Sequence, residues 1–236
     1  MKEHQILMNA EMVRAVLNGS KTQTRRAMKP QPTECPPDYP RPGHWWPSNK
    51  FQTMLHVEDE LQNKAGGWNG LAGDACPLGD TGDRLWVRET WGVISHAFGD
   101  DGEMIDWTPD RPALKINQLK FGRGYYTGHV IYAADGGMEW AGDDDGDGEP
   151  RSAWKPSIHM PREASRITLE ITNVRVERLH AISRGDCMQE GCPFPNIANE
   201  TDPRQWFADL WKSTYSQDNW DSDPWVWVIE FKRVTP

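Results

Sequence analysis

Apolar residues recur with a helical period close to the start of the chain. Asn9 precedes this pattern as a capping residue, and Gly19 follows it as a stop. The pattern therefore predicts one short helix, and the segment after it, residues 20–26, is expected to be extended. The apolar face of the helix consists of Met12, Val13, Val16 and Leu17.

Alternation between apolar and polar residues predicts most of the strands. It is clearest at Ile167, Leu169 and Ile171, slips at Thr172–Asn173 and then resumes, which predicts a bent strand or two strands with a bulge. Shorter alternating runs predict strands within residues 82–93, 125–135 and 224–234.

Two more helices are predicted in the last third of the chain. Ser183 and Asp186 form a capping box and Gly191 ends the helix that they begin. Pro203 begins the other, whose apolar residues fall on one face. Many short strands and few helices predict an α+β fold. We expect a small β-barrel with helices packed on it and long loops.

Three segments interrupt these elements, at about residues 28–81, 96–124 and 134–157. Loops of this length usually serve binding. The first is rich in Pro, Gly and Trp, and a helical stretch is predicted within it at residues 51–64. Because it begins directly after residues 19–26, it is expected to shape or cover the mouth of any pocket built there.

The overall charge limits the partners. The chain has 236 residues with a formal net charge of −9. Binding along a nucleic-acid backbone depends on the number of phosphates neutralised, so general binding of duplex DNA is not expected. A local basic pocket for a nucleotide or an exposed base is compatible with this charge. Four cysteines without CxxC spacing, and no apolar run long enough for a leader or a membrane span, predict a reduced cytoplasmic protein.

The basic run GSKTQTRR carries the most specific motif. It resembles the G-x-K-x-x-x-x-R signature of the ASCH domain, a PUA-like barrel family, with Gly19, Lys21 and Arg26 at its three defining positions. Thr24 stands where many members have Glu. Residues 82–91 and 225–231 resemble strands of the family's core, and residues 156–179 are similar to a long branch of ASCH proteins common in phages and prophages.

This resemblance implies one domain over residues 1–236, with the three segments above as insertions. The implied partner is a modified nucleoside, or RNA bound through a single-stranded or exposed base in a basic cleft. The implied location is the cytoplasm of a bacterial host.

One branch of the family hydrolyses the amide of acetylated cytidine nucleosides, and resemblance to it implies catalytic roles for Lys21, Thr24 and Glu190. A threonine hydroxyl needs a base, and a lysine can serve where burial or nearby cations lower its pKa. Glu190 would oppose that, so its expected role is to polarise the substrate or relay protons. In the last turn of its helix a carboxylate is disfavoured by the helix dipole. We therefore expect Glu190→Gln to leave the fold as stable or slightly more stable.

Further residues are candidates for binding the substrate. Gly19 belongs to the signature, and the planar guanidinium of Arg26 suits a base carbonyl or a phosphate oxygen. An equal alternative for the segment 158–166 is that it closes the barrel and its arginines pair with local acids. His159 and Arg162 would extend the basic pocket toward a ribose or phosphate, and Arg88 and Glu89 are further candidates for binding the substrate.

No cofactor or metal is expected. The acidic run 143–148 matches the first half of a calcium loop, but Trp154 stands where the bidentate Glu is required. Cys187 and Cys192, with His180, have poor spacing for zinc. Two other functions stay open, a non-catalytic RNA-binding module and a ribonuclease that uses His159 with Lys21. The sequence does not indicate the oligomeric state.

Overall fold

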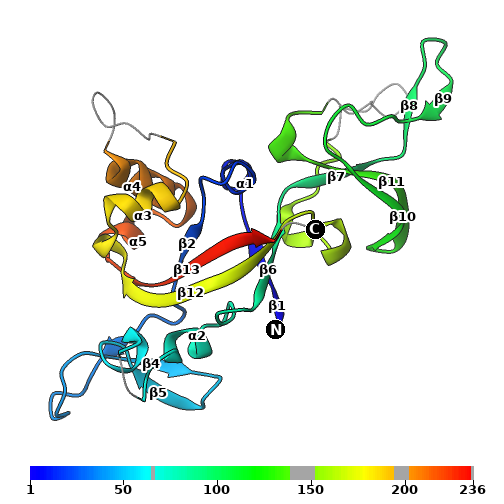
Figure 1. Ribbon diagram of the computed structural model, residues 1–236. Coiled ribbons are helices and arrows are strands. Elements are labelled where there is room, and N and C mark those ends of the chain that lie inside the picture. The colour runs from blue at the N-terminus through cyan, green and yellow to red at the C-terminus, as the bar shows by residue number, and fades with distance from the viewer. Residues whose placement is uncertain (65–66, 139–151, 194–201, 235–236) are drawn as a thin grey trace. The chain divides into compact units, whose positions relative to one another are not determined.

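The chain has an α+β architecture, as the hydrophobic pattern predicts, and it divides into two compact units, whereas one domain was expected (Figure 1). The computed structural model describes residues 1–64, 67–138, 152–193 and 202–234. Unit 1 comprises Met1–His4, Ala15–Leu85 and Leu169–Pro236, and unit 2 comprises Gln5–Arg14 and Trp86–Thr168.

The largest sheet has five strands. Its last two strands pair antiparallel in an unbroken register, from Val226 opposite Ala27 to Glu230 opposite Gln23. The predicted slip at Thr172–Asn173 lies inside a single strand, where both residues are exposed and the alternation of burial resumes after them. In order across the sheet the strands are β1 (Glu3–Leu7), β6 (Arg84–Arg88), β12 (Thr168–Arg178), β13 (Trp225–Val234) and β2 (Gln23–Ala27).

This sheet is open. Strands β1 and β2 stand at its two ends, and no ladder joins them within the described residues. Only α1 (Ala10–Leu17) and its flanking turns separate the two strands in sequence, so α1 carries the chain from one edge of the sheet to the other. The described strands therefore do not form the closed barrel that we expected.

Helices cover one face of the sheet in unit 1. Ser183 caps α3 (Arg184–Gln189) through the predicted capping box with Asp186, and Pro203 begins α4 (Pro203–Thr214). Figure 1 shows α3 and α4 on one side of β12 and β13, with β4, β5 and α2 on the other. Residues buried between the helices and the sheet include Cys187, Phe207, Trp211, Val226 and Val228.

The insertion at residues 28–81 has regular structure of its own. It contains β3 (Thr33–Glu34), β4 (His44–Ser48), β5 (Thr53–His56) and α2 (Leu71–Ala75). The helix predicted at residues 51–64 is wrong, because Met54 and Leu55 pair across a hairpin with Pro47 and Trp46. Only a short 3-10 turn, η1 (Glu60–Gln62), follows. The insertion packs on the sheet through Trp46, whose ring meets that of Trp227 edge-on at 5.3 Å.

Unit 2 is built mainly on a three-stranded antiparallel sheet in the order β10-β11-β7. Its strands are β7 (Trp91–Ile94), β10 (Leu114–Phe121) and β11 (Gly124–Tyr132), and β8 (His96–Phe98) pairs with β9 (Met104–Asp106). The segment 96–124, predicted as irregular, therefore contains three strands. A core of Trp91, Leu119, Val130, Tyr132, Met160 and Ala164 holds this unit together.

Candidate functional site

Lys21 and Glu190 meet although they are 169 residues apart. A left-handed backbone at Gly19 (φ +82°) ends α1, and the chain then turns so that Lys21 forms an isolated β-bridge with Glu190, the C-cap of α3. Gly191 (φ +99°) lets the two segments approach, because a Cβ there would lie 2.9 Å from the Ala15 Cβ and 3.3 Å from the Lys21 Cβ. Two glycines therefore set the geometry of the pair.

The contact is a buried ion pair. The Lys21 Nζ lies 2.7 Å from the Glu190 Oε2 and 2.9 Å from the Glu190 carbonyl oxygen, and the two side chains are 0% and 3% exposed. Burial lowers the pKa of the Lys21 ammonium, and the neighbouring Glu190 carboxylate opposes that shift. The Arg25 Nη1 donates to the Glu190 Oε1 at 3.1 Å. Glu190 is thus bound by two cations.

The pair belongs to a larger charged cluster that the sequence did not indicate. Arg25 also binds Glu177, and its Nη2 lies 3.5 Å from the Asp186 Oδ2. The Gln23 amide donates to the Asp186 Oδ1 at 3.2 Å. Lys21, Gln23 and Arg25 alternate along one face of an extended segment, which is the signal that could have predicted this cluster.

Thr24 and Arg26 lie on the opposite face of β2. Thr24 pairs with Ile229 and Arg26 with Trp227, in the unbroken register with β13. Successive side chains of a strand point to opposite faces, so these two residues share the face of Trp227, on which the insertion packs. The structure therefore brings Lys21 and Glu190 together and places Thr24, which is 1% exposed, across the sheet from them.

The remaining candidates lie in unit 2. The Arg166 guanidinium binds Glu89 through two contacts of 3.0 and 2.9 Å, and burial raises the pKa of the Glu89 carboxyl. Arg88 donates to the Gln5 side chain at 2.6 Å and to the Ile158 carbonyl oxygen. The pairing of Arg166 with Glu89 agrees with the alternative that arginines of the segment 158–166 pair with local acids.

Two more unit 2 candidates follow Arg88 and Glu89 in sequence. Arg162 donates to the Thr168 hydroxyl at 3.3 Å, and its guanidinium lies 6.0 Å from the Trp86 ring. His159 is exposed in the 3-10 turn η3 (Ser157–His159). These contacts hold Arg162 in place but indicate no ligand for either residue.

Metal ligands do not converge among the described residues, where no group of three or more His, Cys, Asp or Glu side chains is arranged to hold an ion. The acidic run 143–148 lies outside the described residues. Cys187 and Cys192 are both buried free thiols, and burial raises the pKa of Cys187 to about 12. None of the helices in the described ranges combines the length and apolarity needed to cross a bilayer.

Comparison with known proteins adds no relative. No protein-family model, no curated protein and no solved structure matches this chain. Membership of the ASCH family therefore stays a prediction that rests on the motif residues.

Proposed function

We propose that this protein is an ASCH-type, PUA-like protein that binds a modified nucleoside or an exposed RNA base and hydrolyses the N-acyl amide of acetylated cytidine. One observation supports this most. Lys21 and Glu190, which resemblance to the amidohydrolase branch selects as catalytic, lie in direct contact at 2.7 Å. Burial lowers the pKa of the Lys21 ammonium, and ionisable groups with a shifted pKa cluster at catalytic sites.

The chemistry needs a proton acceptor and a proton donor. Transfer of one proton across the Lys21–Glu190 contact leaves a neutral amine and a neutral carboxylic acid. The amine then accepts a proton from the attacking nucleophile, and the acid donates one to the departing amine of cytidine. The amide C–N bond breaks, and water supplies the oxygen of the released acetate. Thr24 as nucleophile is a separate prediction, because the transfer described here uses only the Lys21–Glu190 pair.

Lys21→Arg is the sharpest test of this proposal. Arginine preserves the positive charge beside Glu190 but cannot act as a base near neutral pH. Purified protein should release acetate from N4-acetylcytidine, and chromatography of the cytidine product measures the rate of this reaction. Lys21→Arg should abolish turnover in a folded protein. Full turnover in that variant would exclude Lys21 as the base, and Thr24→Val tests the hydroxyl separately.

A second candidate is a non-catalytic RNA-binding module. It is favoured by the second cation on Glu190, since Arg25 and Lys21 together neutralise the carboxylate as they would in a purely structural ion pair. Saturable binding of RNA containing acetylated cytidine, with no product after prolonged incubation, would favour this candidate. The ribonuclease hypothesis gains no support from the described residues, among which no side-chain contact of His159 indicates a catalytic role.

A further inference from the structure

The hairpin formed by β10 and β11 is basic, although the protein as a whole is acidic. Residues 111–134 contain four Lys or Arg and no Asp or Glu, in a chain whose formal net charge is −9. Three of these cations, Lys115, Lys120 and Arg123, are exposed, and none of them pairs with another side chain in the described ranges. Cations without a carboxylate partner are available to bind an anionic ligand from solution.

A bulge brings the two lysines of β10 onto one face of the hairpin. Their spacing of five residues would place Lys115 and Lys120 on opposite faces of a regular strand. The register with β11 shifts within β10, so that Lys115 lies opposite His129 and Lys120 lies opposite Tyr125. Directly opposed side chains share a face, and these two partners are four residues apart on β11. Because Leu119 is buried in the core of unit 2, both lysines project from the face turned away from that core.

Aromatic rings accompany these cations. Tyr125 is 61% exposed and lies directly opposite Lys120, beside the turn that contains Arg123. At the other end of the face, the ring of Trp107 meets that of His129 at 5.6 Å. Exposed aromatic rings flanked by Lys and Arg suit a single-stranded nucleic acid, because its bases stack on the rings while the cations neutralise its phosphates.

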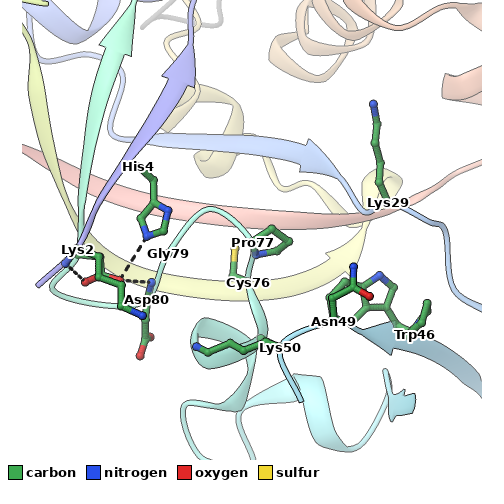
Figure 2. A pocket seen from close by; sticks show the side chains of 13 residues that line it. Lys2, His4, Lys29, Trp46, Asn49, Lys50, Cys76, Pro77, Gly79 and Asp80 are labelled. Atoms are coloured by element: carbon green, nitrogen blue, oxygen red, sulfur yellow. Dashed lines mark hydrogen bonds and ion pairs between the residues drawn. The ribbon is translucent and has the colours of Figure 1, made fainter. Parts of the chain in front are cut away.

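A cavity of about 300 Å³ in unit 1, lined mainly by the insertion, has a different character. Figure 2 shows the Lys29 ammonium directed away from this cavity and the Lys50 ammonium directed toward the side of Asp80. Lys50 already donates to the Asp74 carbonyl oxygen, and Asp80 and Asp83 add negative charge to the lining. The hairpin therefore offers an anionic ligand the better site of the two.

We propose that the β10–β11 hairpin is an interaction surface for single-stranded RNA, with phosphates at Lys115, Lys120 and Arg123 and a base stacked on Tyr125. The choice of RNA rests on the proposed function. Neutralisation of three phosphates gives a slope of about −2 when the logarithm of the association constant is plotted against the logarithm of the salt concentration. So few contacts should give weak binding, with a Kd of roughly 100 μM at physiological salt.

The test is fluorescence anisotropy of a labelled ten-nucleotide oligouridylate, titrated with protein at several salt concentrations. Lys120→Ala removes one phosphate contact, so it should weaken binding and reduce the magnitude of the salt slope by about 0.7. Tyr125→Ala should weaken binding by at least about 5-fold and leave the slope unchanged, whereas Tyr125→Phe should bind like the unaltered protein. The matched control is Lys232→Ala, which removes an exposed lysine of β13 paired with Glu170 and should change neither quantity.

Two results would overturn the proposal. Equal weakening by Lys120→Ala and Lys232→Ala would show non-specific attraction to the charge of the protein. No saturable binding by the unaltered protein at low salt would exclude RNA as the ligand. Self-association that Lys120→Ala abolishes would then identify the ligand as a second copy of the chain, whose β8–β9 hairpin carries Asp100, Asp101 and Glu103.

The oligouridylate has no N-acyl group, so this proposal and the hydrolase proposal fail separately. Binding of the oligonucleotide without deacetylation of free N4-acetylcytidine would refute the hydrolase alone. Deacetylation of the free nucleoside without binding of the oligonucleotide would refute the RNA surface alone.

A second measurement locates the RNA. The indole N–H signal of Trp107, assigned in nitrogen–proton NMR spectra with Trp107→Phe, should shift on titration with the oligouridylate. The signal of Trp220, on α5 (Gln217–Asp221), should not. A Trp107 signal that does not move at saturating oligonucleotide would place the RNA elsewhere and refute the assignment.

Discussion

Replacement of Glu190 by Gln tests how the buried ion pair contributes to stability. The change preserves the shape of the side chain and removes its negative charge. It leaves the ammonium of Lys21, whose side chain is 0% exposed, without an anionic partner. It also replaces one carboxylate oxygen with an N–H₂ group, so that this donor faces another donor, either the Lys21 Nζ or the Arg25 Nη1.

The size of the effect follows from what each partner retains. Removing one member of a buried pair costs about 3–5 kcal/mol. Lys21 retains the hydrogen bond to the Glu190 carbonyl oxygen at 2.9 Å, and Arg25 retains Glu177, so we expect the lower end, about 3 kcal/mol. For a chain of this length that corresponds to a fall in Tm of roughly 6–12 °C.

Thermal melts of the two proteins, followed by circular dichroism, measure this change. The matched control is Glu230→Gln, which removes a half-exposed carboxylate paired with Arg175 and should cost less than about 1 kcal/mol. Without Glu190 the folded-state pKa of Lys21 falls further below its unfolded value. The variant's deficit should therefore shrink as the pH rises through the alkaline range. A variant that melts with the unaltered protein at pH 7 would refute the buried-charge argument.

Two further predictions concern the elements around the pair. Gly191→Ala should destabilise the fold by about 2–4 kcal/mol in urea unfolding, because the left-handed backbone and the approach to Ala15 both exclude a Cβ. The control is Gly19→Ala, which should cost about 1 kcal/mol, since no atom lies within 4 Å of an added Cβ there. Equal losses of stability in the two variants would contradict the crowding at Gly191. Burial would raise the pKa of Asp186, but hydrogen bonds with Ser183 and the charge of Arg25 lower it to about 2, below its ordinary value of 3.8. This stabilisation, about 2 kcal/mol, is present above pH 4 and is lost as the pH falls toward 2. Asp186→Asn should therefore flatten the loss of stability measured between those pH values, and an unchanged acid profile would exclude Asp186 as its source.

The sequence predicted the elements with strong local patterns. The capping box at Ser183 and the proline at the start of α4 appear where expected, because caps depend on residues only three or four positions apart. The strands of the insertion were missed, because their pairing depends on a hairpin formed by a Trp- and Pro-rich segment with no clear alternation. A local hydrophobic pattern therefore does not indicate that β4 and β5 pair with one another.

In the candidate site, too, some features could be predicted from the local sequence and others could not. The contact between Lys21 and Glu190 could be expected only from the resemblance, since no local signal links residues so far apart. The separation of Lys21 from Thr24 could have been predicted from the period of a strand, because residues three apart point to opposite faces. The expectation that Glu190→Gln leaves stability unchanged considered only the helix dipole. The buried contacts of Glu190 with Lys21 and Arg25 instead predict that the substitution lowers the free energy of unfolding.

The order of strands in the main sheet has a consequence for folding during synthesis. Both outer strands, β1 and β2, come from the first 27 residues, whereas β13, the neighbour of β2, ends at Val234. On the ribosome, β2 must wait for nearly the whole described chain before its ladder can form. Sheets completed by contacts between residues so distant in sequence fold slowly, and their strand edges stay unpaired until then. The charged residues of β2 would keep that waiting edge from pairing with other nascent chains.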